Sequence, residues 1–257
     1  MTGESRYYGS RMCPDVLNSM KRLFRSVCLS VTVMLSNGVF ADSSLMVFTE
    51  SSPPYHYVEN GKVIGEVTDK VRNIIARAGY TAEFKVFPWA RAVLNTQRHN
   101  RALIFSIART PERENQYQWI APVTQFELGI LALSARNDIS ISNWRDLTAY
   151  SVATQRGDIA EKWLKELGFK EGQNLIACAD IVCSWEELKR GTVDFIIEDP
   201  RLVADTAELV GLKVTDVTMH QLIPELSVTA HLAASSTMPP AIVARLRRAA
   251  NEIGYRP

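Results

Sequence analysis

The sequence is poor in the residues from which metal sites are built. Its 257 residues include four cysteines and four histidines, and the histidines do not follow the close spacing that metal ligands need. A His-Glu-x-x-His motif, a phosphate-binding glycine loop and a Ser-His-Asp order are missing too. We therefore expect no metal site, no cofactor and no catalytic activity.

An excess of one charge and long apolar runs are also lacking. The 29 Lys and Arg side chains balance 28 Asp and Glu, which leaves a net charge of +1, so nothing favours nucleic acid or an anionic membrane as a partner. The most apolar early segment, residues 26–35, is too short to span a bilayer. The full sequence is 46% hydrophobic, a globular composition with room for one large or two small domains.

The short apolar segment is instead typical of a signal peptide. Residues 20–25, which include the basic Lys21, Arg22 and Arg25, precede it. A small-residue cleavage site that ends at Ala41 follows it. Met20 fits a start codon better than Met1, so residues 1–41 are predicted to be a signal peptide with an N-terminal extension. The alternatives are a buried helix or a membrane anchor. Cleavage after Ala41 predicts a periplasmic protein.

Beyond residue 41 the sequence holds two cysteines, Cys178 and Cys183. In an oxidising compartment a pair with this spacing forms a disulfide, which we predict here. The alternative is two buried thiols.

Apolar segments of strand length alternate with helical patterns along the rest of the chain. The first half predicts a parallel β/α unit with strands at residues 45–49, 82–87 and 102–106. A second β/α series follows, with strands at residues 150–154, 175–177, 193–197 and 213–217. Two long apolar strands, residues 126–133 and 226–232, connect the series. This pattern fits two lobes with two crossings, and also a single doubly wound domain.

The most informative stretch is residues 102–122, ALIFSIARTPERENQYQWIAP. A buried strand leads into Thr-Pro-Glu at residues 110–112, which predicts the N-cap and first turn of a helix. Free backbone N–H groups would then meet beside Arg109 and Arg113 and form a site for a small anion, most simply a carboxylate. The alternative is that both arginines are solvated and the cap only begins a helix.

The same stretch carries a resemblance. SIARTPERE at residues 106–114, with PWARA at 88–92 and SPPY at 52–55, resembles the family 3 solute-binding proteins of bacterial ABC importers, in particular a proteobacterial branch. The resemblance implies an α/β fold of two lobes, periplasmic-binding-protein-like (type II), with a mixed sheet in each lobe flanked by helices. The implied boundaries are residues 42–130 and 225–257 for a discontinuous first lobe and 131–224 for the second.

The resemblance also implies which side chains contact a ligand. Arg113 matches the arginine that grips the ligand's α-carboxylate, a contact worth ~2–3 kcal/mol. Asp199 matches the carboxylate that takes the ammonium group, although its place before Pro200 is equally explained by a helix cap; Glu198 is the alternative contact. Trp89 matches an aromatic that packs on the ligand, with a core tryptophan as the alternative.

Other candidates lie in loops at the predicted strand ends. Ser106 and Ala108 match positions that offer hydroxyl or backbone groups, and Ala108 lacks the hydroxyl that relatives often have. Ser52 stands where relatives often place an aromatic residue. The remaining candidates are Glu50, Tyr55, Arg109 and the loop of Arg156, Gly157 and Asp158, which is implied to supply N–H groups at a helix N-terminus.

Together these residues predict a periplasmic binding protein of an ABC importer. Its two lobes would close on an amino acid or similar small polar carboxylate solute and deliver it to an inner-membrane ABC permease. We expect a monomer with no nucleic-acid partner. One alternative is a dehydratase-like enzyme on the same scaffold, with acid–base work at Glu50, Glu198 or Asp199. The other is a module that senses the solute.

Overall fold

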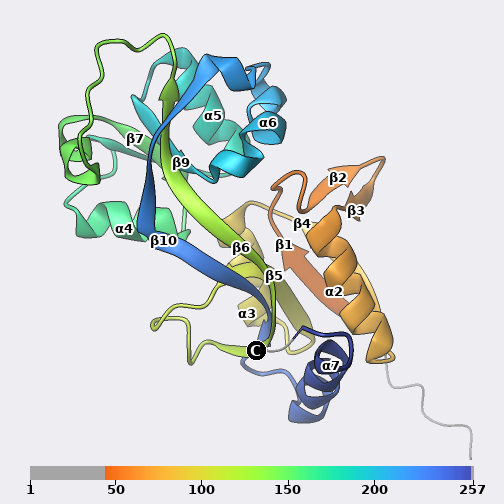
Figure 1. Cartoon of the computed structure of the whole chain (residues 1–257). Helices are drawn as coiled ribbons and strands as arrows, with labels where there is room; N and C mark the ends of the chain where they lie inside the picture. The colour runs from red at the N-terminus through yellow and green to blue at the C-terminus, as the bar shows by residue number, and fades with distance from the viewer. Residues whose placement is uncertain (1–43, 256–257) are drawn as a thin grey trace, which may run out of the picture. The chain divides into compact units, whose positions relative to one another are not determined.

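The computed structural model describes residues 44–255, and the predicted signal peptide lies outside them (Figure 1). Strands and helices alternate around one mixed sheet of eight strands in the order β4-β1-β5-β10-β6-β9-β7-β8. These strands are β1 Ser44–Thr49, β4 Thr81–Val86, β5 Ala102–Ala108, β6 Tyr117–Leu133, β7 Val152–Gln155, β8 Leu175–Cys178, β9 Phe195–Glu198 and β10 Val217–Ser235. A hairpin of β2, Tyr57–Glu59, and β3, Lys62–Ile64, lies outside this sheet.

Each end of the sheet is a parallel β/α unit. β1 runs parallel to β4 and β5, and β7 runs parallel to β8 and β9. The helices are α2 Glu66–Arg77, α3 Trp89–Arg98, α4 Ile159–Glu166, α5 Ile181–Arg190, α6 Val203–Thr206 and α7 Pro240–Glu252, with 3-10 turns at η1 Trp144–Ala149, η2 Pro200–Leu202, η3 Glu208–Val210 and η4 Val214–Asp216. Within residues 44–255 no helix is both long and apolar enough to cross a membrane.

Helical spacing of apolar side chains explains the longer helices. In α2, Val67, Val71 and Ile74 recur on one face and are buried against the sheet. The same pattern buries Ile242 and Leu246 of α7 in the same core. Burial of these apolar faces against the sheet stabilises both helices.

The long strands β6 and β10 connect the two parallel units. They pair antiparallel side by side, green and blue in Figure 1. Ile120 and Leu232 belong to a core with α2 and α7, whereas Ile130 and Ile223 belong to a second core with β7 and β9. Because one strand pair supplies both cores, the chain folds as two lobes that share it. The lobe boundaries expected from the sequence fall within these two strands.

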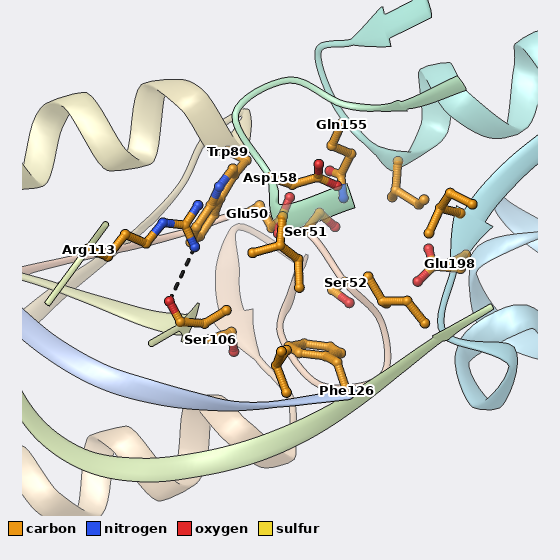
Figure 2. A pocket seen from close by; sticks show the side chains of 16 residues that line it. Glu50, Ser51, Ser52, Trp89, Ser106, Arg113, Phe126, Gln155, Asp158 and Glu198 are labelled. Carbon is orange, nitrogen blue, oxygen red and sulfur yellow. Dashed lines mark hydrogen bonds between the residues drawn. The ribbon is translucent and has the colours of Figure 1, made fainter. Parts of the chain in front are cut away.

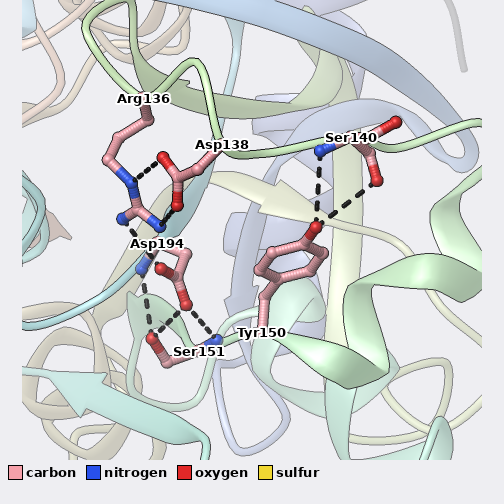
Figure 3. A network of polar contacts seen from close by, with 6 residues as sticks. All are labelled: Arg136, Asp138, Ser140, Tyr150, Ser151 and Asp194. Carbon is pink, nitrogen blue, oxygen red and sulfur yellow. Dashed lines mark hydrogen bonds and ion pairs between the residues drawn. The ribbon is translucent and has the colours of Figure 1, made fainter.

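Within the second lobe, a polar network joins the loop after β6 to the segments just before β7 and β9 (Figure 3). Arg136 pairs with Asp194 at 2.8 Å, and Asp194 accepts the backbone N–H and the hydroxyl of Ser151, both at 2.8 Å. The Tyr150 hydroxyl accepts the N–H of Ser140 at 3.3 Å. These bonds fix the entry to β7, whose far end reaches the site described below.

The disulfide predicted from the sequence is present. Cys178, the last residue of β8, is bonded to Cys183 in the first turn of α5. Between them, Asp180 caps α5 by accepting the N–H of Cys183 at 2.9 Å. The bridge therefore holds the start of α5 against the sheet.

Two expected elements do not form. The helix expected from Thr110 is instead a pair of successive turns, with N–H of Arg113 bonded to Thr110 O and N–H of Gln116 to Arg113 O, both at 3.0 Å. The strand expected at residues 213–217 is the 3-10 turn η4, because the Asp216 carboxylate accepts the N–H of Lys213 at 2.9 Å and bends the chain.

Candidate functional site

A cavity lies where the strands of both lobes end. From the first lobe it is lined by Glu50 after β1, Trp89 at the start of α3, and Ser106 of β5. From the second it is lined by Asp158 before α4 and Glu198 at the end of β9. The space inside it, counting the part open to solvent, is about 640 Å³. Carboxyl ends of strands in open α/β sheets are where ligands bind.

The structure brings most of the expected site residues to this cavity. Those that line it are Glu50, Ser52, Trp89, Ser106, Ala108, Arg113, Asp158 and Glu198 (Figure 2). Sequence reasoning missed several others, namely Ser51, Phe126, Leu128, Gln155, Ile159, Ile181, Ile197 and Val228. Of these, four adjoin expected residues and could have been found by extending each segment by one position: Ser51, Gln155, Ile159 and Ile197.

Arg113 points into the cavity beside the ring of Trp89, with its guanidinium carbon 5.8 Å from the ring centroid (Figure 2). It donates hydrogen bonds to the main-chain oxygens of Ala108 at 3.3 Å and Gly157 at 3.0 Å. The Trp89 indole N–H donates to the same Gly157 oxygen at 3.1 Å. Gly157 has a φ of 79°, which glycine adopts without strain and which lets its carbonyl face both donors. Two first-lobe side chains thus meet one second-lobe carbonyl.

Ser106 stands out in β5. Its φ is 61°, a left-handed conformation that costs a non-glycine residue about 1–3 kcal/mol. The side chain is 8% exposed, and its hydroxyl has no hydrogen-bond partner among the described residues. Strain and an unsatisfied buried hydroxyl at a cavity wall together mark a functional position.

The N-terminus of α4 is occupied by the protein's own carboxylates. Asp158 accepts the N–H of Glu161 at 2.6 Å and the hydroxyl of Thr154 at 3.0 Å. Glu161 in turn accepts the N–H of Gly157 at 2.6 Å. The backbone donors that the sequence assigned to a ligand in this loop are therefore already used.

Three carboxyl groups in the cavity titrate well above their ordinary range. Burial raises the pKa of Glu50, and the neighbouring Asp158 and Glu198 carboxyls raise it further. Burial raises the pKa of Asp158 to about 7, against the hydrogen bonds that lower it. Burial likewise raises the pKa of Glu198 to about 8, although the N–H of Asp199 counteracts it. Groups shifted in this way gather at binding and catalytic sites.

Asp199, an expected ammonium contact, lies outside the cavity. It is fully buried and accepts the N–H of Glu127 at 3.1 Å and the N–H of Arg201 at 3.0 Å. It also pairs with the guanidinium of Arg201 at 2.5 Å. These bonds use both carboxylate oxygens, so the helix-cap interpretation describes its role.

The other expected residues that do not line the cavity also have partners elsewhere. Arg109 pairs with Glu114 at 2.6 Å and lies over the ring of Trp119. Arg156 pairs with Glu171 at 2.5 Å. Tyr55 packs its ring against Phe126, at 5.8 Å between centroids, so it supports a cavity wall from behind. Gly157 reaches the site through its carbonyl alone.

Structures similar to this chain are two-lobed binding proteins. An ancestral arginine-binding protein bound to arginine matches with a TM-score of 0.70 and 22% identity, over 82% of this chain and 92% of that one. The arginine-, lysine-, histidine-binding protein ArtJ from Geobacillus stearothermophilus matches with a TM-score of 0.69 and 19% identity, over 82% and 89%. A histidine kinase sensor domain with similarity to periplasmic binding proteins matches with a TM-score of 0.68 and 20% identity, over 82% and 91%.

No curated protein matches the sequence. The family model of the bacterial extracellular solute-binding proteins, family 3, matches residues 45–208, more than half of the chain. That range holds the cavity residues from Glu50 to Glu198. The chain belongs to the bacterial extracellular solute-binding proteins, family 3.

Proposed function

We propose that this protein is a periplasmic receptor that closes its two lobes on a small polar solute of amino-acid size and delivers it to an inner-membrane ABC permease. The observation that carries the proposal is the cavity at the strand ends of both lobes, with polar side chains on each side. Arg113 faces this cavity and binds a carbonyl of the opposite lobe. Its guanidinium therefore serves both to line the site and to hold the closed state.

Similar structures support a nitrogen-rich solute. Arginine is bound in the ancestral arginine-binding protein, and ArtJ is described as binding arginine, lysine and histidine. Sequence identities near 20% show a shared fold and do not show which solute is bound. Binding measurements therefore have to identify the solute. A thermal-shift screen of amino acids and small amines on the mature protein does this, because a ligand that binds only the folded state raises Tm.

Arg113→Ala tests the site. Losing hydrogen bonds made by a charged group removes about 1.5–3 kcal/mol, and we expect the Kd of the best solute to rise about 10-fold to 100-fold. Isothermal titration calorimetry measures the change, with Arg109→Ala as the matched control because Arg109 lies outside the cavity. An Arg113→Ala variant that is folded and retains the original Kd would remove Arg113 from the site.

Solute sensing is the second candidate function, favoured by the likeness to a histidine kinase sensor domain. Uptake of radiolabelled solute by cells with and without the gene separates the two. Transport predicts that deletion abolishes high-affinity uptake. Sensing predicts unchanged uptake and a lost transcriptional response to the same solute.

A further inference from the structure

The second lobe turns the ends of three neighbouring parallel strands toward the cavity. β9 ends at Glu198, β7 at Gln155 and β8 at Cys178, and the three strands lie next to one another in the sheet. Glu198 and Gln155 line the cavity (Figure 2). Beyond Cys178 the lining continues with Ile181, the first residue of α5. The position of this part of the wall therefore depends on how β8 is joined to α5.

The disulfide encloses Ile181. This side chain lies in the sequence between Cys178, at the end of β8, and Cys183, in the first turn of α5. It is 3% exposed and belongs to the same apolar core as Cys178. The bridge keeps the Cα atoms of the two cysteines 5.6 Å apart. Because one of them is part of the sheet, the bridge restrains the first turn of α5 against a shift relative to the sheet, a movement that would displace Ile181 from the wall.

The same strand end is paired with Gln155. In the parallel ladder of β7 and β8, Gln155 is the register partner of Cys178, and the N–H of Arg156 donates to the Cys178 oxygen at 2.8 Å. Oε1 of Gln155 is buried and has no hydrogen-bond partner among the described residues. A buried oxygen of this kind at a cavity wall suits an N–H donor of a bound solute. Cys178 thus adjoins a polar and an apolar part of the wall.

An effect on the unfolded chain alone does not explain where the bridge lies. A cross-link restricts the unfolded chain more as the closed loop lengthens, and the two cysteines here are five residues apart in the sequence. A pair with this spacing would have the same effect at any place in the chain. Here the pair flanks a residue of the cavity wall, so the bridge also acts on the geometry of the folded site.

We propose that the disulfide is a positioning element of the solute site. It holds Ile181 against the second-lobe wall beside Gln155, and its loss weakens the binding of solutes whose side chain reaches this wall. The inference rests on the proposed function and adds a role for Cys178 and Cys183 in affinity. Ile181 makes the contact with the solute, and the bridge acts through it.

The mobility of Ile181 is measured first, without a solute. Methyl NMR of the mature protein gives order parameters for Ile181 and Ile197 in the oxidised parent and in the Cys178→Ala, Cys183→Ala double variant. We expect the order parameter of Ile181 to fall and that of Ile197, which lines the cavity from β9, to stay at the parent value. An unchanged order parameter of Ile181 overturns the inference.

The reduced parent protein is a second preparation in which the bridge is open without a substitution. Dithiothreitol supplies the two electrons and two protons that convert the cystine to two thiols, and closes to its own cyclic disulfide. We expect the reduced parent to behave as the double variant does. It replaces that variant in every measurement if the double variant does not fold.

Calorimetry then measures affinity. L-arginine and L-glutamine are the first probes, because their long side chains end in N–H groups that suit Ile181 and the Gln155 oxygen; the other common amino acids follow. We expect the Kd of the tightest probe to rise about 10-fold in the double variant and in Ile181→Ala. Combining the substitutions should add little, because both remove the same contact.

Leu188→Ala is the matched control. Leu188 lies further along α5 in the core that holds Cys178, but it does not line the cavity. This variant is expected to lower Tm and to leave the Kd close to the parent value. An unchanged Kd in the folded double variant, or a full further loss when the bridge is removed from Ile181→Ala, overturns the inference and leaves the proposed function standing. A parent protein that binds no amino acid of the series overturns both.

Discussion

Ser106 combines two unfavourable features at one position. The left-handed backbone and the unpaired hydroxyl both lower the stability of the empty protein. Natural proteins retain a strained backbone or an unpaired buried group mainly at functional sites, where the group contributes to binding or catalysis. The next residues of the strand, Ile107 and Ala108, are buried without such strain, so the feature is confined to the cavity wall.

Two substitutions at this position separate its roles. Ser106→Ala removes the unpaired hydroxyl and is expected to raise the free energy of unfolding by about 1 kcal/mol. Ser106→Gly removes the hydroxyl and also relieves the backbone strain, and is expected to raise it further by about 0.5–1 kcal/mol. Both should weaken solute binding. Urea denaturation and calorimetry measure the two effects, and destabilisation by Ser106→Gly would contradict the strain assignment.

The buried carboxyl groups also predict a pH dependence of stability. A carboxyl whose folded pKa is raised binds its proton more tightly in the folded state, so its contribution is complete below the unfolded pKa and is lost as pH rises through the folded value. Glu198, with a folded pKa of about 8, therefore destabilises the empty protein as pH rises from 6.5 to 8.5. We expect a loss of about 1–2 kcal/mol over this range.

The contribution of His56 to the free energy of unfolding changes at lower pH and in the opposite direction. Burial lowers its pKa to about 4, so its contribution is present above the unfolded value of 6.5 and is lost as pH falls toward 4. Between pH 6.5 and 8.5, the change in the free energy of unfolding therefore comes mainly from the buried carboxyl groups. Glu198→Gln, which keeps an oxygen for the N–H of Asp199, should flatten the urea-denaturation profile there; an equally steep profile would reassign the effect to other groups.

At the scale of elements, spacing patterns succeeded where a segment covers an apolar surface. The strands of both β/α units and the helices between them were predictable because apolar side chains recur at strand or helix spacing and are buried accordingly. The predicted positions of Glu50 and Ser106 follow from the same rule, since parallel strands end at the same edge of the sheet.

Prediction failed where local cues fit two structures. Thr110 and Pro111 suit a helix start and also a β-turn, and the polar residues after them supply no apolar face that would extend a helix. For Asp199 the sequence leaves a ligand contact and a helix cap open, and in the structure its carboxylate accepts a hydrogen bond from Arg201, two residues further on. Phe126 reaches the cavity from within β6, a position that only the tertiary pairing of β6 with β10 determines.

The disulfide between β8 and α5 yields a prediction at this scale. Closing so short a loop stabilises by about 2 kcal/mol through the unfolded chain. The Cys178→Ala, Cys183→Ala double variant should therefore lose about this much free energy of unfolding and become insensitive to dithiothreitol, which lowers the Tm of the parent protein. A parent Tm that is unaffected by complete reduction would exclude a stabilising role for the bridge.

At the scale of the whole described chain, contacts between the lobes concentrate at the loop before α4. Arg113 and Trp89 both donate to the Gly157 carbonyl, and Glu112 pairs with Lys162 of α4 at 2.5 Å. These contacts do not require a solute, so under the proposed lobe closure they would set how much of the empty protein is closed. The measured Kd then equals the intrinsic value divided by the closed fraction.

Trp89→Phe tests this coupling, because it keeps an aromatic wall and removes the hydrogen bond from the indole to Gly157, while that from Arg113 remains. A net loss of about 1 kcal/mol should shift the empty protein toward the open state and weaken binding roughly fivefold. Small-angle X-ray scattering reports the larger radius of gyration and calorimetry the higher Kd, with Trp144→Phe, outside the cavity, as control. If the Kd rises while the radius of gyration of the empty protein stays at the parent value, Trp89 acts through contact with the solute and not through closure. If both rise together, the hydrogen bond from Trp89 stabilises the closed form of the empty protein. Closure that exists before binding then contributes to the affinity for the solute.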